Sequence, residues 1–181
     1  EVEFSPMYKE QPLFSDVDVF VRDKLGLELW DIRRAHWKYK QKGYRAPLKG
    51  RLIFGDALYL RPVSTLGEWL SSMDKGVAKS KLHALINTSI AYGFLDYTAT
   101  IIATSFFGEY LTKEEERAII KQLKKSSRSF YPLRNGNRFL YHALNILAHS
   151  FKPTYEGWAN SDPHIGSKKK SFFKIILQRL I

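Results

Sequence analysis

Two glutamates at the start of the sequence have the spacing of carboxylates that act on one side of a sheet. Glu1 and Glu3 alternate with Val2 and Phe4. Side chains two residues apart in a strand point to the same face. Both carboxylates would therefore face one side, where they could orient a hydroxyl or amine nucleophile or accept its proton. The alternative is a pair of glutamates that face solvent at the end of a strand.

A second candidate pair interrupts an apolar run. Asp56 and Tyr59 lie within residues 51–60, which are otherwise mostly apolar. A carboxylate buried there would need a partner, because an isolated buried charge is very costly. We expect an arginine from residues 33–51 to supply that partner. The sequence favours a structural ion pair over a catalytic role for Asp56.

The remaining residue types that often carry chemistry form no motif. None of the five histidines has a carboxylate at the spacing of a zinc site. The chain has no cysteine, which removes thiolate ligands and cysteine nucleophiles. It also has no nucleophile elbow, phosphate-binding loop or Ser-His-Asp order. We therefore predict no metal site and expect the histidines in the core or on the surface.

Positive charge is the strongest signal in the composition. The formal net charge is +11, and residues 33–51 carry eight basic residues and no acidic one. Aromatic rings and cations alternate within this segment, as in surfaces that stack bases or sugars. The candidate contacts for an anionic partner are Arg33, Arg34, Trp37, Lys38, Lys40 and Arg45. An ordinary hairpin with lysine and arginine stems lying over the rings is the alternative.

The amino-terminal residues and the hydropathy pattern bear on location. The first residues are acidic and lack the apolar core of a signal peptide, and the absence of cysteine fits a reducing compartment. No uncharged apolar run reaches the roughly 20 residues that a membrane span needs. The longest apolar stretch, residues 82–107, is interrupted by polar residues. We expect a cytoplasmic protein without a transmembrane segment, in which this stretch is a buried helix pair.

The first 62 residues must position the candidate groups on strands and one helix. We expect strands at residues 1–5, 27–32 and 51–60, with a long hairpin loop over 33–50 or a continuation of the strand over 36–39. A helix from Pro12 to Lys24 should stop at Gly26. It should bury one apolar face, formed by Leu13, Phe14, Val17, Phe20, Val21 and Leu25. The lone first strand has no parallel neighbour within this chain and requires one upstream.

Beyond Pro62 the pattern becomes helical. Ser64 should cap a helix that runs to Asp74, and helices should follow over residues 79–92 and 94–107. Thr112 and Glu115 form a capping box for the next helix, which reaches about Lys125. Another helix is expected over residues 138–150. After a loop that contains Pro153 and Gly166, residues 171–181 form a last helix, behind three lysines at 168–170. This helix either closes a core or docks on an anionic membrane surface.

Four short motifs occur in a fixed order in the first third of the chain. They are Glu1-Val2-Glu3-Phe4, then QPLFSDVD at 11–18, GLELWDI at 26–32 and GRLIFGDALYLR at 50–61. Together with the expected strands and helix, they resemble the end of an FkbM-type methyltransferase domain. The resemblance implies an α/β region followed by mostly α structure. Residues 1–62 would complete a class I methyltransferase-like sheet with a strand, a helix and an antiparallel strand pair, and residues 63–181 would be an appended helical domain.

The resemblance also implies an activity. Enzymes of this family transfer a methyl group from S-adenosylmethionine to oxygen, commonly on a sugar or another small hydroxyl compound. The carboxyl end of the first strand would border the acceptor cleft, which makes Glu1, Glu3, Asp56 and Tyr59 the acceptor-side candidates. The cofactor would lie at the early strands of the sheet. This chain contains no Gly-x-Gly-x-x-Gly turn, so no cofactor-binding residue is assigned and the chain alone is expected to be inactive.

A non-catalytic function is the alternative. A basic helical module could bind nucleic acid, an acidic glycan or a membrane surface through its cations. The methyl acceptor, the oligomeric state and the role of the helical region stay open at this point.

Overall fold

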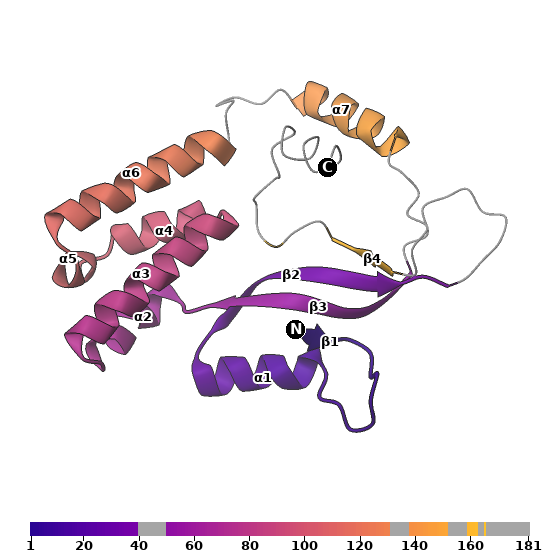
Figure 1. Ribbon diagram of the computed structural model, residues 1–181, viewed down its shortest axis with the longest axis horizontal. Helices are drawn as coiled ribbons and strands as arrows, with labels where there is room; N and C mark the ends of the chain where they lie inside the picture. The colour runs from indigo at the N-terminus through magenta and orange to yellow at the C-terminus, as the bar shows by residue number, and fades with distance from the viewer. Residues whose placement is uncertain (40–49, 131–137, 152–158, 163–164, 166–181) are drawn as a thin grey trace, which may run out of the picture.

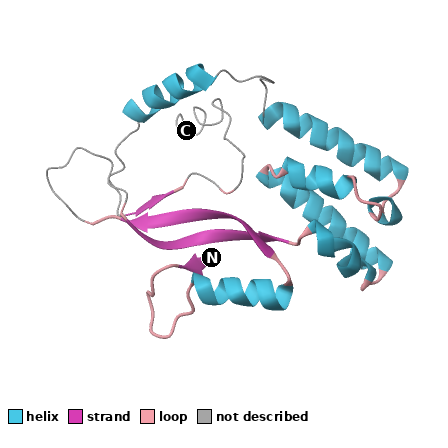
Figure 2. Cartoon of the chain, turned by 180° about the vertical axis from the view of Figure 1, so that it is seen from behind, coloured by secondary structure: helices cyan, strands magenta, loops and turns pink. Residues whose placement is uncertain are grey.

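The computed structural model describes residues 1–39, 50–130, 138–151, 159–162 and 165. Within these residues a small antiparallel sheet is followed by a largely helical region (Figures 1 and 2). The strands are β1 (Val2–Glu3), β2 (Glu28–Trp37), β3 (Arg51–Leu60) and β4 (Ala159–Ser161), in the spatial order β1-β3-β2-β4. Helix α1 (Phe14–Leu25) lies along the sheet, and helices α2 to α6 gather beyond one end of the strands. The expected change from mixed α/β to mostly α structure is confirmed.

The β2–β3 hairpin is the main framework of the sheet. The predicted strand over residues 51–60 is confirmed. Strand β2 continues through residues 33–37, where the sequence predicted a hairpin loop with a possible continuation of the strand only over 36–39. The extension is stabilised because Ala35 and His36 are buried and pair with β3 on one side and β4 on the other. The two strands approach closely at Gly55, where a Cβ atom would lie 2.7 Å from the carbonyl oxygen of Arg33.

Strand β1 is shorter than expected. It pairs antiparallel with β3 through Val2 opposite Gly55 and Glu3 opposite Phe54. The next two amides, of Phe4 and Ser5, both donate to the carbonyl of Ile53, at 2.7 and 3.2 Å. Because two donors share one acceptor, the regular ladder ends there.

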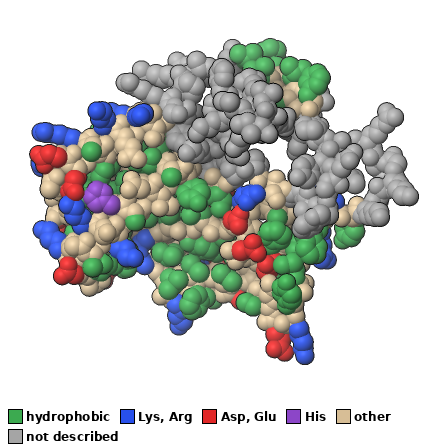
Figure 3. Space-filling model, viewed as in Figure 1, with side chains coloured by type: hydrophobic (Ala, Val, Ile, Leu, Met, Phe, Trp, Pro, Cys, Tyr) green, Lys and Arg blue, Asp and Glu red, His purple; other side chains and the backbone are tan. Residues whose placement is uncertain are grey.

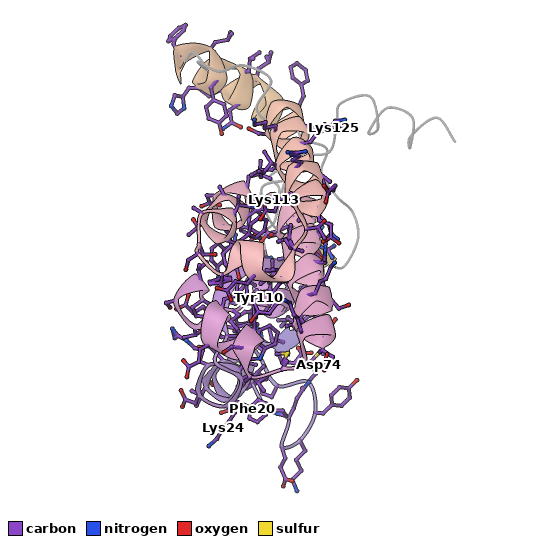
Figure 4. The ribbon with its side chains drawn as sticks, turned by 90° about the vertical axis from the view of Figure 1, so that its left-hand side faces the viewer. Phe20, Lys24, Asp74, Tyr110, Lys113 and Lys125 are labelled. Atoms are coloured by element: carbon purple, nitrogen blue, oxygen red, sulfur yellow. The ribbon has the colours of Figure 1, made fainter. Side chains whose placement is uncertain are left out.

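Helix α1 connects β1 to β2 and buries its apolar face only in part. Gly26 ends it with a φ of 61°, as predicted, and its amide donates to the carbonyl of Arg22. No residue of α1 is buried, and Phe20 is 56% exposed. The predicted face is therefore only partly covered: Phe14, Val17 and Val21 are half-buried, whereas Phe20 and Leu25 are exposed. Phe20 is labelled near the base of Figure 4.

The helical region is a bundle with its own core. It contains α2 (Val63–Ser71), α3 (Lys75–Tyr92), α4 (Leu95–Ile102), α5 (Phe107–Tyr110) and α6 (Lys113–Phe130). Its fully buried side chains are Leu66, Leu70, Ala78, Leu82, Ile86, Ser89, Thr98 and Ile101. The buried helix pair expected over residues 82–107 is present, although a single helix over 94–107 is wrong. Helix α4 stops at Ile102, where the Thr104 hydroxyl donates to the carbonyl of Ile101 at 2.6 Å and competes with helix continuation.

The start of the bundle also differs from the prediction. Pro62, not Ser64, is the N-cap residue of α2, and no side chain caps this helix. The helix ends at Ser71, three residues earlier than expected. Asp74 instead caps α3, because its carboxylate accepts from the amide of Gly76 at 2.9 Å.

The sheet and the bundle share hydrophobic contacts across Pro62. Leu60, the last residue of β3, belongs to the buried cluster of the bundle. Trp30 of β2 packs edge-on against Phe94 and Tyr97, with ring centroids 5.3 and 4.7 Å apart. The Tyr97 hydroxyl donates to the carbonyl of Arg61 at 2.6 Å, and burial raises the pKa of Tyr97 to about 12. These contacts fix the sheet against the helices.

The capping box at the start of α6 is confirmed. The amide of Thr112 donates to Glu115 at 2.8 Å, and the amide of Glu115 donates to the Thr112 hydroxyl at 3.3 Å. Glu115 also forms an ion pair with Lys79 of α3 at 2.8 Å. The Lys79 contact, followed by the Thr112 amide, lowers the pKa of Glu115 to about 2. The carboxylate thus ties α6 to α3.

Replacing Glu115 by glutamine should remove a pH-dependent part of the stability. A carboxyl group whose pKa is lowered by folding stabilises the protein above its ordinary value of 4.5, and this contribution disappears as the pH falls toward about 2. Thermal unfolding should therefore occur at a lower temperature in the variant than in the wild type at pH 7, and the difference should shrink between about pH 4.5 and pH 2. The control is Glu114→Gln, at an exposed neighbour; an equal loss in that variant would contradict the assignment.

The last described elements are α7 (Arg138–Ser150) and β4. Helix α7 matches the prediction for residues 138–150. Strand β4 was not predicted, because its residues lie in the stretch expected to be a loop. The predicted helix over 171–181 and the lysines at 168–170 lie outside the described residues. Among the helices that the structure describes, none is long and apolar enough to cross a membrane.

Candidate functional site

The sheet face opposite α1 carries a group of charged side chains. Residues paired directly across antiparallel strands share a face, and Glu3 is opposite Phe54 while Arg33 is opposite Asp56. Phe54 and Asp56 are two residues apart on β3, so Glu3, Arg33 and Asp56 lie on the same side of the sheet. We call this side, defined by these three residues, the polar face. Figure 3 shows acidic and basic side chains gathered near the middle of the molecule.

Glu3 has the most unusual environment of the acidic candidates. It is only 8% exposed, and its Oε2 atom is buried without a hydrogen-bond partner among the described residues. Burial, followed by the charge of Glu1, raises the pKa of Glu3, and the positive amino terminus opposes this shift. Glu1 is exposed. A carboxylate that retains its proton more readily is a stronger base when it is ionised, so Glu3 is suited to accept a proton.

Asp56 has the arginine partner that the sequence predicted. The Nη1 atom of Arg33 donates to Oδ2 of Asp56 at 3.0 Å. The pair is half-exposed rather than buried: the side chains of Arg33 and Asp56 are 43% and 46% exposed. Both side chains lie on the solvent-accessible side of the sheet, so the ion pair forms without deep burial.

Tyr59 is separated from the other acceptor-side candidates. It lies three residues after Asp56 on β3, and its hydroxyl donates to Oδ1 of Asp18 on α1 at 3.0 Å. Burial and this hydrogen bond raise the pKa of Tyr59 to about 12. The side chain therefore points to the α1 side, where it ties the helix to the sheet, and it does not join the polar face.

Asp162 is a functional-site neighbour that the sequence analysis missed. Its Oδ2 atom accepts from Nε of Arg34 at 2.8 Å and from the Arg34 amide at 3.1 Å. Its backbone carbonyl accepts from Nε of Arg33 at 3.0 Å. Burial tends to raise the pKa of Asp162, but the hydrogen bonds from Arg34 outweigh it, so the pKa is lowered. The only available signal was compositional: beyond Glu116, Glu156 and Asp162 are the only acidic residues.

Two cations of the predicted anionic-partner surface already form ion pairs within this chain. Arg33 pairs with Asp56, and Arg34 pairs with Asp162. Trp37 is 38% exposed and Lys38 is half-buried. Lys40 and Arg45 lie outside the described residues. The hypothesis of an anion-binding hairpin therefore stays a prediction, with two of its arginines already paired.

The histidines take the ordinary positions expected for them where they are described. His36 is buried on β2, and His83 lies 3.6 Å from Glu115 on the bundle surface. No group of three or more histidine and acidic side chains gathers as a metal site would require in the part of the chain that is described.

Comparison with known proteins adds no relative to this description. No family model, curated protein or solved structure matches the chain.

Proposed function

We propose that this chain is the acceptor-side end of an S-adenosylmethionine-dependent methyltransferase of the FkbM type, which methylates the hydroxyl group of a sugar or other small molecule. The observation that carries the proposal is the strand order. In the seven-stranded class I sheet, the last strand runs antiparallel between the fifth and the sixth. Here β3 lies between β1 and β2 and is antiparallel to both. This arrangement supports the order of motifs found in the sequence.

The connection between the strands supports the same proposal. Because β1 and β2 are both antiparallel to β3, they run parallel to each other, and α1 links them as a crossover helix. A strand–helix–strand crossover is the building unit of sheets with helices on their faces. The second edge of β1 has no partner among the described strands, so a parallel strand of a larger sheet can add there.

The polar face supplies the chemistry assigned to this chain. Glu3 lies at the carboxyl end of β1, the end that would border the acceptor cleft. Its carboxylate would accept a hydrogen bond from the acceptor hydroxyl and hold the proton that the hydroxyl loses. Arg33 and Asp56 would keep the neighbouring surface charged and hydrogen-bonded.

The cofactor site is assigned to a part of the sheet that these residues do not form. When bound there, S-adenosylmethionine would supply an activated methyl group. The sequence contains no glycine-rich turn after a strand, and such a turn is where this class of sheet holds its nucleotide. The residues present therefore do not fit the cofactor.

Calorimetry with S-adenosylmethionine tests the assignment of the cofactor site to strands outside these 181 residues. The 181-residue chain should show no binding, because it lacks the nucleotide-binding strands. The same chain extended upstream in its reading frame to include those strands should bind the cofactor and transfer a labelled methyl group to sugar hydroxyls. Measurable binding by the 181 residues alone would contradict the assignment. Failure of a folded, extended protein to bind would contradict the methyltransferase proposal itself.

A further inference from the structure

Four cations form a stripe along one side of α6. They are Arg117, Lys121, Lys124 and Lys125. At about 3.6 residues per turn, their spacing places them within an arc of about 100° of the helix. Ile119 is buried and lies on the opposite side of the helix from this arc. The bundle therefore holds α6 by its apolar side and presents the cations outward.

The stripe borders a surface groove. The groove has a volume of about 600 Å³, and the described residues that line it are Ile120 and the four cations, none of them acidic. All four cationic residues are exposed, and none forms an ion pair with a carboxylate of the described residues. Figure 4 shows α6 running from Lys113 past the packed helices to Lys125 near its far end. Closely spaced like charges around one groove favour a bound polyanion.

The acidic residues of α6 do not neutralise the stripe. Glu115 pairs with Lys79, and Glu116 pairs with Lys113. Glu114 lies on the same side as the stripe but one turn before Arg117, outside the groove lining. The acids thus occupy the first turn, where they suit the helix dipole, and leave the rest of this side positive.

We propose that the α6 groove binds the phosphate backbone of a nucleic acid. Each strand of a duplex carries a charge about every 3.4 Å along its axis, which is dense enough to engage cations one helical turn apart. Lysine is a point-charge phosphate ligand, and arginine pairs with phosphate through two parallel hydrogen bonds. A membrane surface is less suitable, because an interfacial helix needs a free apolar face, whereas the apolar side of α6 packs into the bundle. The proposal is independent of the methyl transfer.

Fluorescence anisotropy with a short labelled DNA duplex tests the groove. The stripe variant combines Lys121→Glu, Lys124→Glu and Lys125→Glu. The matched control combines Lys9→Glu, Lys75→Glu and Lys81→Glu, which are exposed positions away from the groove and carry the same change in net charge. The stripe variant should bind at least about 10-fold more weakly at low salt. Because three lysines would no longer neutralise phosphates, the slope of log affinity against log salt should also fall by about 3. The control should change both by much less.

Two further measurements separate loss of positive charge in the groove from loss of folding. A variant with Lys121→Arg, Lys124→Arg and Lys125→Arg should retain duplex binding, and circular dichroism should show that each variant is folded. Equal loss in the stripe variant and the matched control would overturn the proposal in favour of general charge attraction. Loss in a folded arginine variant would overturn it in favour of a structural role. Stripe-dependent binding to heparin or to phosphatidylserine vesicles without duplex binding would overturn the choice of partner.

Discussion

Replacing Leu82 by alanine should lower the free energy of unfolding by about 3–5 kcal/mol, in the upper part of the range for buried leucines. Leu82 is 0% exposed at the centre of α3 and belongs to the buried cluster that joins the helices of the bundle. Truncation would remove buried methyl groups and leave a cavity that this close-packed cluster can refill only in part. Urea unfolding followed by circular dichroism measures the loss directly.

The matched control is Leu25→Ala, the same chemical change at a leucine that is 45% exposed on α1. It should cost less than about 1 kcal/mol, because little apolar surface is removed from a packed environment. If both variants lost the same stability, the bundle could not be the main stabilising core. A single transition by circular dichroism and tryptophan fluorescence is also expected for Leu82→Ala, since Leu60 and Trp30 connect the sheet to this core.

Local signals explain why much of the fold was predictable. Gly26 ends α1 because glycine adopts a positive φ at low cost. Thr112 and Glu115 define the start of α6 through hydrogen bonds between residues only three apart. The apolar run of residues 51–60 gave β3 its correct bounds. In each of these places the information needed to choose the structure lies within a few residues.

The incorrect predictions share a different physical cause. Strand β4 forms because residues 159–161 pair with the edge of β2, a contact that no local pattern encodes. The burial expected for Phe20 depended on a sheet wide enough to cover α1, and periodicity indicates only which side of a helix is apolar. Ser64 had the correct residue type for a cap, but the helix already begins at Val63, so Ser64 lies within its first turn.

The residues of the candidate site show the same contrast between local patterns and contacts that are distant in the sequence. The Arg33–Asp56 pair was predictable because residues 33–51 carry eight cations and no acid, although Asp56 is not buried as its apolar strand suggested. Asp162 was missed because it lies 128 residues away from Arg34 in the sequence. Tyr59 was grouped with Asp56 through proximity in sequence, although an odd spacing in a strand places side chains on opposite faces. Alternation alone could have separated these two residues.

Replacing Glu3 by glutamine should first change the stability of the 181-residue chain. Folding raises the pKa of Glu3 above its ordinary value of 4.5, mainly through burial. The folded state therefore binds this proton more tightly than the unfolded state, and stability falls as the pH rises through this range. A neutral, nearly isosteric glutamine removes that penalty, so Glu3→Gln should unfold at a higher temperature than the wild type at pH 7 and lose this advantage near pH 4. A lower unfolding temperature at pH 7 would contradict the unfavourable burial of the charge.

The same substitution in the upstream-extended protein should lower kcat by about 10²- to 10⁴-fold, the usual contribution of a positioned general base. KM for the acceptor should change much less, because glutamine still offers an oxygen that accepts a hydrogen bond from the hydroxyl. The wild-type rate should fall at low pH as Glu3 becomes protonated, and the residual rate of the variant should lack this step. Glu1→Gln is the matched control, since Glu1 is an exposed carboxylate two residues before Glu3, and it should retain most of the activity. A stable Glu3→Gln enzyme with wild-type kcat, or an equal loss in Glu1→Gln, would show that Glu3 does not receive the proton.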